Sequence, residues 1–324
     1  MRPAYRVAAD IGATWARFRL LDAGGRSLGQ RRLPTRSFGA GARFVQQVDA
    51  LCAEIGPSAG RLAGVVLAVA GPVQEGRAQM TNGELLLDQP QLARGFDCPV
   101  RICNDFYALA HGLNAFEQLR PLGTAQVDPS AVRVLLGPGS GLGMALCVPV
   151  AGTRGFQVLP SEGGHAPLAV RTPLEHEVLR TLQSQSGAVP IWETVLSGPG
   201  LLRLYRALAE VRDEPPIHGT PEAVSAAALD GSDELATATI EQFGAWLGDC
   251  AASLAFTACA EGGVYLVGDL ARAIAEPLAT GPLRNRFDAR DVMTDYARRI
   301  AINLVLDPDP GLLGVSVLAA AQDD

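Results

Sequence analysis

The chain has 324 residues, of which 48% are apolar and 19% charged, an ordinary globular composition with material for two domains of ~100–200 residues. Its formal net charge is −7 and no basic stripe appears, which argues against a nucleic-acid partner. No apolar run reaches the ~18 residues of a membrane span, and the first residues lack the pattern of a signal peptide. We therefore expect a soluble, cytoplasmic protein with no membrane partner.

The first half of the chain alternates between strand and helix patterns. Residues 5–10 and 15–22 predict two strands around a glycine-containing turn, a hairpin that opens the fold. A helical spacing of apolar residues over 41–56 precedes a buried strand at 61–70. A short strand at 99–103 then leads into a helical stretch at 106–113.

The second half begins with a repeat of the opening device. Residues 133–150 predict a strand, a glycine turn and a second strand. Helix starts follow at Thr220-Pro221-Glu222 and at Ser232-Asp233-Glu234, and the second of these helices extends to about Cys259. Residues 261–274 predict strand, turn and helix, and residues 307–320 a Pro/Gly break and a short helix. The repeated pattern favours two similar α/β halves facing a cleft.

Two residue counts exclude further classes of site. The chain contains no lysine, so it cannot hold a P-loop nucleotide site, which requires one. Its six cysteines form no CxxC pair and mostly lie in apolar stretches, which predicts buried, reduced thiols rather than disulfides or zinc ligands: Cys52, Cys98, Cys103, Cys147, Cys250 and Cys259.

The first hairpin turn carries Asp10, Gly12 and Thr14. Glycine lets the backbone approach an anion, the hydroxyl can donate to a phosphate oxygen, and the carboxylate can hold Mg²⁺ or its waters. The alternative is a plain hairpin turn, in which this sequence pattern is common.

The second glycine turn runs from Gly137 to Gly143 and has four glycines in seven residues, with Ser140 among them. Glycines are costly between two strands unless the backbone must bend or approach a ligand. A second phosphate-binding turn is therefore one interpretation, and a glycine-rich hairpin loop is the other.

Three further segments carry polar side chains. Glu162 and His165, separated by two glycines, can share a pocket and hydrogen-bond vicinal hydroxyls; a zinc pair would need a third ligand, and none is nearby. Asn104 and Asp105 follow a buried strand, at the end where α/β proteins bind ligands, although both are also preferred helix caps. By itself the cap is the better interpretation, and Glu193 likewise reads as part of a helix that precedes a glycine break.

Taken together and in order, these segments resemble the bacterial glucokinase family of the hexokinase–actin superfamily. The resemblance runs from residue 9 to about 314 and lies in ADIGATWARF, VAGPV with MTN, NDFYALAHGL, LLGPGSGLGMAL, LPSEGGHAPLA, ETVLSGPGLLRLYRAL, EGGVYLVGDL and PGLLG. It implies an α/β fold of two actin-like, ribonuclease-H-like domains that flank a sugar- and ATP-binding cleft. The smaller domain would comprise residues 1–110 plus 301–324, and the larger one residues 111–300.

The resemblance also implies roles for single residues. Asp105 would be the catalytic base, and the glucose-binding residues would be Asn104, Asp105, Glu162, His165 and Glu193. The ATP-binding residues would be Asp10, Gly12 and Thr14 in the first phosphate loop, Gly137, Ser140 and Gly141 in the second, and Gly268 near the adenosine. Asp10 would hold Mg²⁺ through water.

The implied activity is transfer of the γ-phosphoryl group of ATP to the 6-hydroxyl of glucose, with Mg²⁺ as cofactor and a homodimer as the common family assembly. The chain departs from the family pattern at Ala13, Trp15 and Asp269, all in the nucleotide segments. Two alternatives follow: a catalytically weak, sugar-binding regulatory protein on the same fold, or a hexose kinase with another donor, such as polyphosphate, or another sugar.

Overall fold

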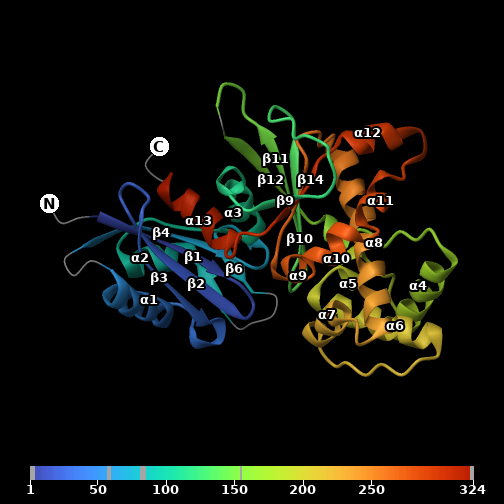
Figure 1. Ribbon diagram of the computed structural model, residues 1–324. Coiled ribbons are helices and arrows are strands. Elements are labelled where there is room, and N and C mark those ends of the chain that lie inside the picture. Colours follow the sequence, from blue (N-terminus) through green and yellow to red (C-terminus); the bar gives the residue numbers. More distant parts are fainter. Residues whose placement is uncertain (1–3, 57–59, 81–84, 154, 322–324) are drawn as a thin grey trace. The chain divides into compact units, whose positions relative to one another are not determined.

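The computed structural model describes residues 4–56, 60–80, 85–153 and 155–321 (Figure 1). The chain divides into two compact units, one of Met1–Glu117 with Asp307–Asp324 and the other of Gln118–Leu306. The first unit is therefore discontinuous, because the end of the chain returns to it. Each unit is an α/β structure with its own sheet and its own core.

The sheet of the first unit has five strands in the order β3-β2-β1-β4-β8. The predicted opening hairpin is confirmed, since β1 and β2 pair antiparallel, whereas β1, β4 and β8 run parallel. The strands are β1 (Ala4–Ile11), β2 (Trp15–Asp22), β3 (Ser27–Pro34), β4 (Arg61–Val69) and β8 (Val100–Asn104). A small separate sheet is formed by β5 (Val73–Gln74), β6 (Arg77–Gln79) and β7 (Leu86–Asp88).

Helices cover both faces of this five-stranded sheet. Because strand side chains alternate, Val7, Ala9 and Ile11 pack on one face with α1 (Ala42–Ile55) and α2 (Gln89–Phe96). Ala8 lies on the other face, with α3 (Asp105–His111) and α13 (Pro310–Ala320). The short 3₁₀ helices η1 (Thr35–Ser37) and η2 (Leu113–Ala115) complete the unit. The C-terminal helix is thus a layer of the first unit.

The second unit has a six-stranded sheet in the order β12-β11-β10-β13-β14-β9. The predicted second hairpin is confirmed by the antiparallel pairing of β10 and β11. The strands are β9 (Leu119–Pro121), β10 (Arg133–Pro138), β11 (Leu142–Pro149), β12 (Phe156–Ser161), β13 (Val264–Leu266) and β14 (Ile302–Val305). Strand β14, which the predicted boundary at residue 300 would assign to the smaller domain, pairs here with β13 and β9.

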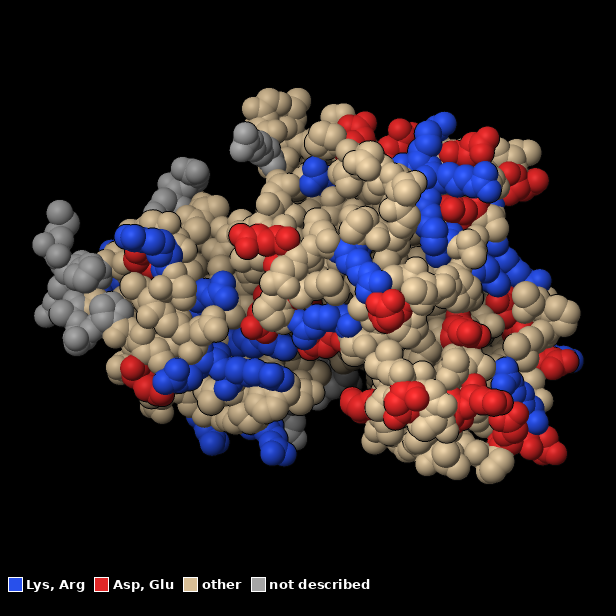
Figure 2. Space-filling model, in the orientation of Figure 1, with Lys and Arg blue, Asp and Glu red and all other residues tan. Residues whose placement is uncertain are grey.

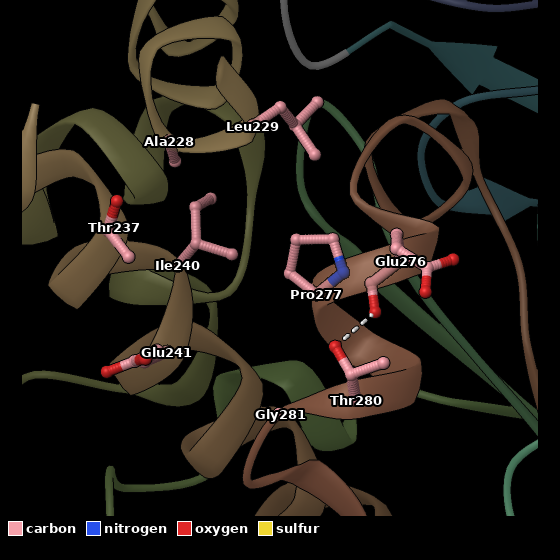
Figure 3. A pocket seen from close by; sticks show the side chains of 9 residues that line it. All are labelled: Ala228, Leu229, Thr237, Ile240, Glu241, Glu276, Pro277, Thr280 and Gly281. Carbon is pink, nitrogen blue, oxygen red and sulfur yellow. Dashed lines mark hydrogen bonds between the residues drawn. The ribbon is translucent and has the colours of Figure 1, made fainter. Parts of the chain in front are cut away.

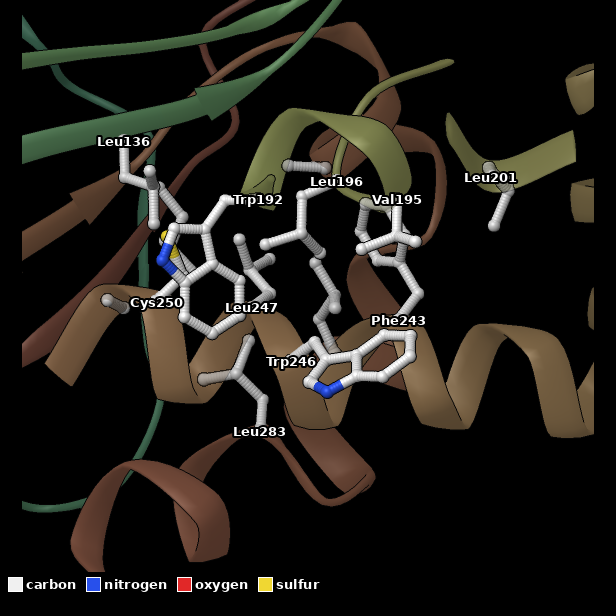
Figure 4. Packing of buried hydrophobic residues seen from close by; sticks show 14 of the residues in the cluster. Leu136, Trp192, Val195, Leu196, Leu201, Phe243, Trp246, Leu247, Cys250 and Leu283 are labelled. Carbon is white, nitrogen blue, oxygen red and sulfur yellow. The ribbon is translucent and has the colours of Figure 1, made fainter. Parts of the chain in front are cut away.

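The helices of the second unit pack around α8, which spans 25 residues. Trp192 and Val195 point toward α8 and pack with Phe243 and Leu247 in the unit's largest core (Figure 4). The helices are α4 (Pro173–Ser186), α5 (Trp192–Val195), α6 (Gly198–Arg212), α7 (Pro221–Asp230), α8 (Glu234–Ala258), α9 (Asp269–Ala273), α10 (Ala275–Thr280), α11 (Leu283–Asp288) and α12 (Thr294–Arg299), with η3 (Gly163–His165) and η4 (Asp291–Met293).

The predicted helix starts are confirmed: Thr220 caps α7 and Asp233 caps α8 through their side chains. The expected glycine break after Glu193 is wrong in detail, because Gly198 to Gly200 form the first turn of α6 and Ser197 caps it. All six cysteines are free, as expected, and five are buried. Cys259 is the exception, since it is exposed at the C-terminal end of α8.

Two further properties concern membrane-spanning helices and surface charge. Among the described helices, none is long and apolar enough to cross a membrane. On the face drawn in Figure 2, arginine and acidic side chains lie next to one another over α4, α11 and α12. Some of these contacts are ion pairs, such as Arg284 with Asp288 at 2.8 Å and Arg298 with Asp295 at 3.6 Å. The charges of this region are therefore mixed in sign.

Candidate functional site

The first hairpin turn is hydrogen-bonded to Thr35, the first residue of η1. The Gly12 N–H donates to the Trp15 carbonyl at 3.0 Å, and the Thr35 hydroxyl donates to the Gly12 carbonyl at 2.7 Å. The Thr35 N–H donates to the Thr14 carbonyl at 2.9 Å. A Cβ atom on Gly12 would lie only 3.2 Å from the Trp15 carbonyl. The turn is thus a fixed structure, and the Thr14 side chain is exposed at its tip.

Asp10 lies on the α13 face of the sheet, largely shielded from solvent. Its Oδ2 is 3.4 Å from the Arg17 guanidinium, whose Nε is 2.9 Å from Asp309 before α13. Helix α13 approaches so closely that a Cβ on Gly311 would lie 2.8 Å from Asp10 Oδ2. The sequence analysis did not predict the contact between Arg17 and Asp10. The available signal was their spacing in the predicted hairpin, because the two residues pair directly across its strands.

The side chains of Asn104 and Asp105, at the end of β8, make different hydrogen bonds. The Asn104 carbonyl oxygen Oδ1 accepts from the Tyr107 N–H at 3.1 Å, and its Nδ2 donates to the Gly71 carbonyl at 3.2 Å. Asn104 is therefore the cap of α3 and also holds the segment after β4. Asp105 is the first residue of the helix, and its Oδ1 accepts from the Phe106 N–H at 2.9 Å.

The register of the parallel strands brings the candidates of the first unit to one edge. Asp10 pairs with Ala68, and Ala68 pairs with Cys103. Because neighbouring strands lie about 4.8 Å apart, Asp10 and Cys103 are about 10 Å apart at the same level of the sheet. Gly12, Thr14, Asn104 and Asp105 follow just beyond that level. The first unit thus places a glycine turn and a carboxylate at the carboxyl edge of its sheet, where α/β folds bind ligands.

The glycine turn between β10 and β11 is held by neighbouring segments of the second unit. The Gly139 N–H donates to the Gly141 carbonyl at 2.8 Å, and the Gly139 carbonyl accepts from the Gly198 N–H at 2.8 Å. Gly268 has φ 109° and approaches the turn, because a Cβ there would lie 2.9 Å from the Pro138 carbonyl. Ser140 is exposed at the tip. The structure therefore brings Gly268 to the second turn.

Glu193 reaches the same turn from α5. Its Oε2 accepts from the Leu142 N–H at 2.7 Å. A Cβ on Gly141 would lie 2.5 Å from that oxygen, so only glycine leaves room for the carboxylate. The bond between Glu193 and the turn is a contact that sequence reasoning missed entirely.

Glu162 precedes η3 and His165 is its last residue, and η3 packs directly on strand β11. A Cβ on Gly164 would lie 2.4 Å from the Leu142 carbonyl, and one on Gly163 would lie 2.8 Å from Met144 Sδ. Gly164 is thus required by the close approach of the backbones, whereas Gly163 faces a flexible side chain. The His165 ring lies 3.6 Å from Glu162 Oε2, and both side chains are more than half exposed.

The segment after η3 is joined to the segment that carries Glu193. The Trp192 N–H donates to the Ala166 carbonyl at 3.0 Å, and Pro167 forms a β-bridge with Ile191. Leu142 therefore lies at the centre of a group formed by the second glycine turn, Glu162, His165 and Glu193. The second unit thus gathers two carboxylates and an imidazole beside a glycine turn.

A separate pocket of about 290 Å³ lies between α7, α8 and α10 in the second unit (Figure 3). Leu229, Ile240 and Pro277 form its apolar walls, and Glu241 and Glu276 its acidic rim. None of the candidate site residues lines it.

Comparison with known proteins gives a consistent result. The family model described as Glucokinase matches residues 7–322. A glucokinase of Saccharophagus degradans is 36% identical over 304 residues, which cover 92% of this chain and 93% of that protein. The crystal structure of a glucokinase from an Antarctic psychrotroph has a TM-score of 0.81 and 30% identity, with 97% of this chain and 98% of that one covered.

A more distant structure shares the fold. A ROK-family glucokinase from Streptomyces griseus, in complex with glucose and AMPPNP, has a TM-score of 0.67 at 21% identity, with 97% of this chain and 99% of that one covered. The α/β fold of both units, with a glycine turn in each, is therefore that of the hexokinase-type sugar kinases. Within that class, the chain belongs to the glucokinase family.

Proposed function

We propose that this protein is an ATP-dependent glucokinase, which transfers the γ-phosphoryl group of ATP to the 6-hydroxyl of glucose in the cytoplasm. Family membership supports the reaction. The catalytic assignment rests on one observation, the capping of α3 by the side chain of Asn104. Because Asn104 provides the cap, the Asp105 carboxylate is not required for it. An aspartate so placed suits the role of general base.

In the proposed reaction, Asp105 accepts the proton of the glucose 6-hydroxyl as its oxygen bonds to the γ-phosphorus. The bond from that phosphorus to the bridging oxygen breaks, and ADP leaves with the electron pair. Phosphoryl transfer of this kind depends mainly on alignment and on stabilisation of charge. The hydroxyls of glucose would be held by side chains that donate and accept hydrogen bonds: Asn104, Asp105, Glu162, His165 and Glu193.

The donor would be held by the two glycine turns. Their backbone N–H groups, together with the hydroxyls of Thr14 and Ser140, suit phosphate oxygens, and Gly268 lies where we place the adenosine. Among the described residues, no group of three or more His, Cys, Asp or Glu could hold a metal ion. We place Mg²⁺ with the bound ATP, where it would meet the protein through water at Asp10 and neutralise phosphate charge.

Two of the three departures from the family pattern, Asp269 and Trp15, have local partners. The Asp269 carboxylate pairs with Arg272 of the same helix at 2.8 Å. The Arg32 guanidinium lies 4.2 Å from the centroid of the Trp15 ring, which is 36% exposed. A cation stacked on an aromatic face is stabilised by ~0.5–1 kcal/mol at an exposed site. These contacts support a nucleotide site that differs from its relatives in detail and retains its two turns.

The test is Asp105→Ala, assayed by glucose-dependent release of ADP and by calorimetric titration with glucose. We expect kcat to fall about 10²–10⁴-fold, the usual contribution of a general base, with glucose binding retained. A near-normal kcat would remove Asp105 from the role. In the wild-type protein, glucose binding without ATP binding or turnover would favour the regulatory alternative, and turnover with polyphosphate alone would change the donor.

A further inference from the structure

The Glu193 carboxylate is packed against the backbone of the second glycine turn. Its Oε2 is 2.7 Å from the Leu142 nitrogen, a short distance typical of a hydrogen bond to an ionised acceptor. Gly141 leaves the space that this carboxylate occupies, since a Cβ there would lie 3.2 Å from Glu193 Cδ as well as 2.5 Å from Oε2. The turn and the carboxylate are therefore fitted to each other.

The helix that carries Glu193 is itself fixed. Trp192 and Val195, on either side of it, are 4% and 0% exposed and lie in the core shown in Figure 4. The Ser197 hydroxyl donates to the Glu193 carbonyl at 3.0 Å, and the Gly198 N–H donates to the Gly139 carbonyl at 2.8 Å. The glycine turn is thus held at both ends by one rigid segment, residues 192–198.

A carboxylate has more acceptor capacity than this contact uses. Each of its oxygens can accept more than one hydrogen bond, so Oε1 can accept from a sugar hydroxyl while Oε2 keeps the Leu142 N–H. The single side chain would then contact the sugar and the donor-phosphate turn together. Glu162 offers no such connection, because its carboxylate is 80% exposed and faces His165 at 3.6 Å.

We infer that Glu193 is a positioning residue for the donor-phosphate turn (Gly137–Gly143), and that it couples nucleotide binding to sugar binding. The inference rests on the proposed function of both sites. A turn that is already ordered loses less conformational entropy when the nucleotide binds. By linkage, the factor by which bound glucose raises the affinity for the nucleotide equals the factor by which bound nucleotide raises the affinity for glucose.

The test compares nucleotide affinity in the absence of glucose, where a residue that only binds sugar has no influence. Calorimetric titration with Mg·AMPPNP is carried out on the wild type, Glu193→Ala, Glu193→Gln and the control Glu162→Gln. We expect Glu193→Ala to weaken nucleotide binding about ten-fold, as for the loss of a charge-assisted hydrogen bond. Glu193→Gln, which keeps a neutral acceptor, should lose less, and Glu162→Gln should equal the wild type.

A second set of titrations, at saturating glucose, measures the coupling. Glucose should raise the affinity of the wild type for the nucleotide, and this gain should disappear in Glu193→Ala. Equal affinities for all four proteins without glucose would overturn the inference while leaving the proposed function intact. A wild type that binds no nucleotide would overturn both. If Glu193→Ala unfolds at assay temperature, the comparison of Glu193→Gln with Glu162→Gln decides in the same way.

Discussion

Helix α13 crosses α3 at a contact between two backbones, and Gly314→Ala tests it. A Cβ on Gly314 would lie 2.3 Å from the Ala108 carbonyl oxygen and 2.7 Å from Leu109 Cα. Restoring an ordinary contact requires a shift of the helices by about 1 Å, since no flexible side chain can give way. We expect an overpacking cost of ~3 kcal/mol, offset by ~1 kcal/mol from the better helix propensity of alanine.

The net loss of ~2 kcal/mol should lower the unfolding temperature of the first unit by about 5–10 °C, as followed by circular dichroism. Since α3 begins at Asp105, kcat should also fall. The matched control is Gly244→Ala in the middle of α8, where the nearest atom to an added Cβ is Leu278 Cδ2 at 3.6 Å. It should gain ~0.5–1 kcal/mol. A Gly314→Ala protein as stable as the wild type would refute the reasoning.

Three further predictions concern single side chains. Under native conditions a thiol reagent should modify Cys259 quickly and the five buried cysteines only after unfolding, because burial raises the pKa of thiols such as Cys103 to about 12; a second fast thiol would contradict this. Glu175→Gln should cost ~3 kcal/mol at pH 7, because it breaks a buried pair with Arg286 at 2.8 Å. Burial alone would raise the pKa of Glu175, but hydrogen bonds led by that of Arg286 hold it below 4.5. The stability is therefore present above the usual pKa of a glutamate and is lost as the pH falls through the lowered pKa of Glu175, so denaturant titrations of the two proteins should converge as the pH is lowered. Trp15→Phe should abolish most acrylamide quenching of fluorescence, since the other two tryptophans are buried; unchanged quenching would be inconsistent with an exposed ring.

The elements that could be predicted from the sequence rest on local signals. Both glycine hairpins, the helix caps Thr220 and Asp233, and the C-terminal helix follow from residues close together in the chain. The short strands β5, β6, β7 and β9 were not anticipated. Each has two or three residues, too few for a period of apolar side chains to be recognised.

The candidate site was also predictable only in part. The sequence indicated which residues could bind a ligand and in which segments they lie, but it did not indicate which residues they contact. Glu193 meets Leu142 across 51 residues, and no local pattern encodes that contact. The glycines after Glu193 were read as a break because glycine usually ends a helix, whereas Ser197 caps a new helix that starts with them. Cys259 was read as buried from its apolar neighbours, yet it lies at the left-handed end of α8, φ 48°.

The return of α13 to the first unit has a consequence for synthesis of the protein. Leu312, Val315 and Ala8 belong to one cluster, so the first sheet emerges from the ribosome with one apolar face covered only by α3. At ~5–20 residues per second, that face waits about 10–40 s for its last helix. The second unit is continuous and is translated during this time, so it can fold before the first unit is complete. The edge that carries Asp105 is therefore completed last, and a nascent chain stopped before residue 310 would present that partly covered face to chaperones.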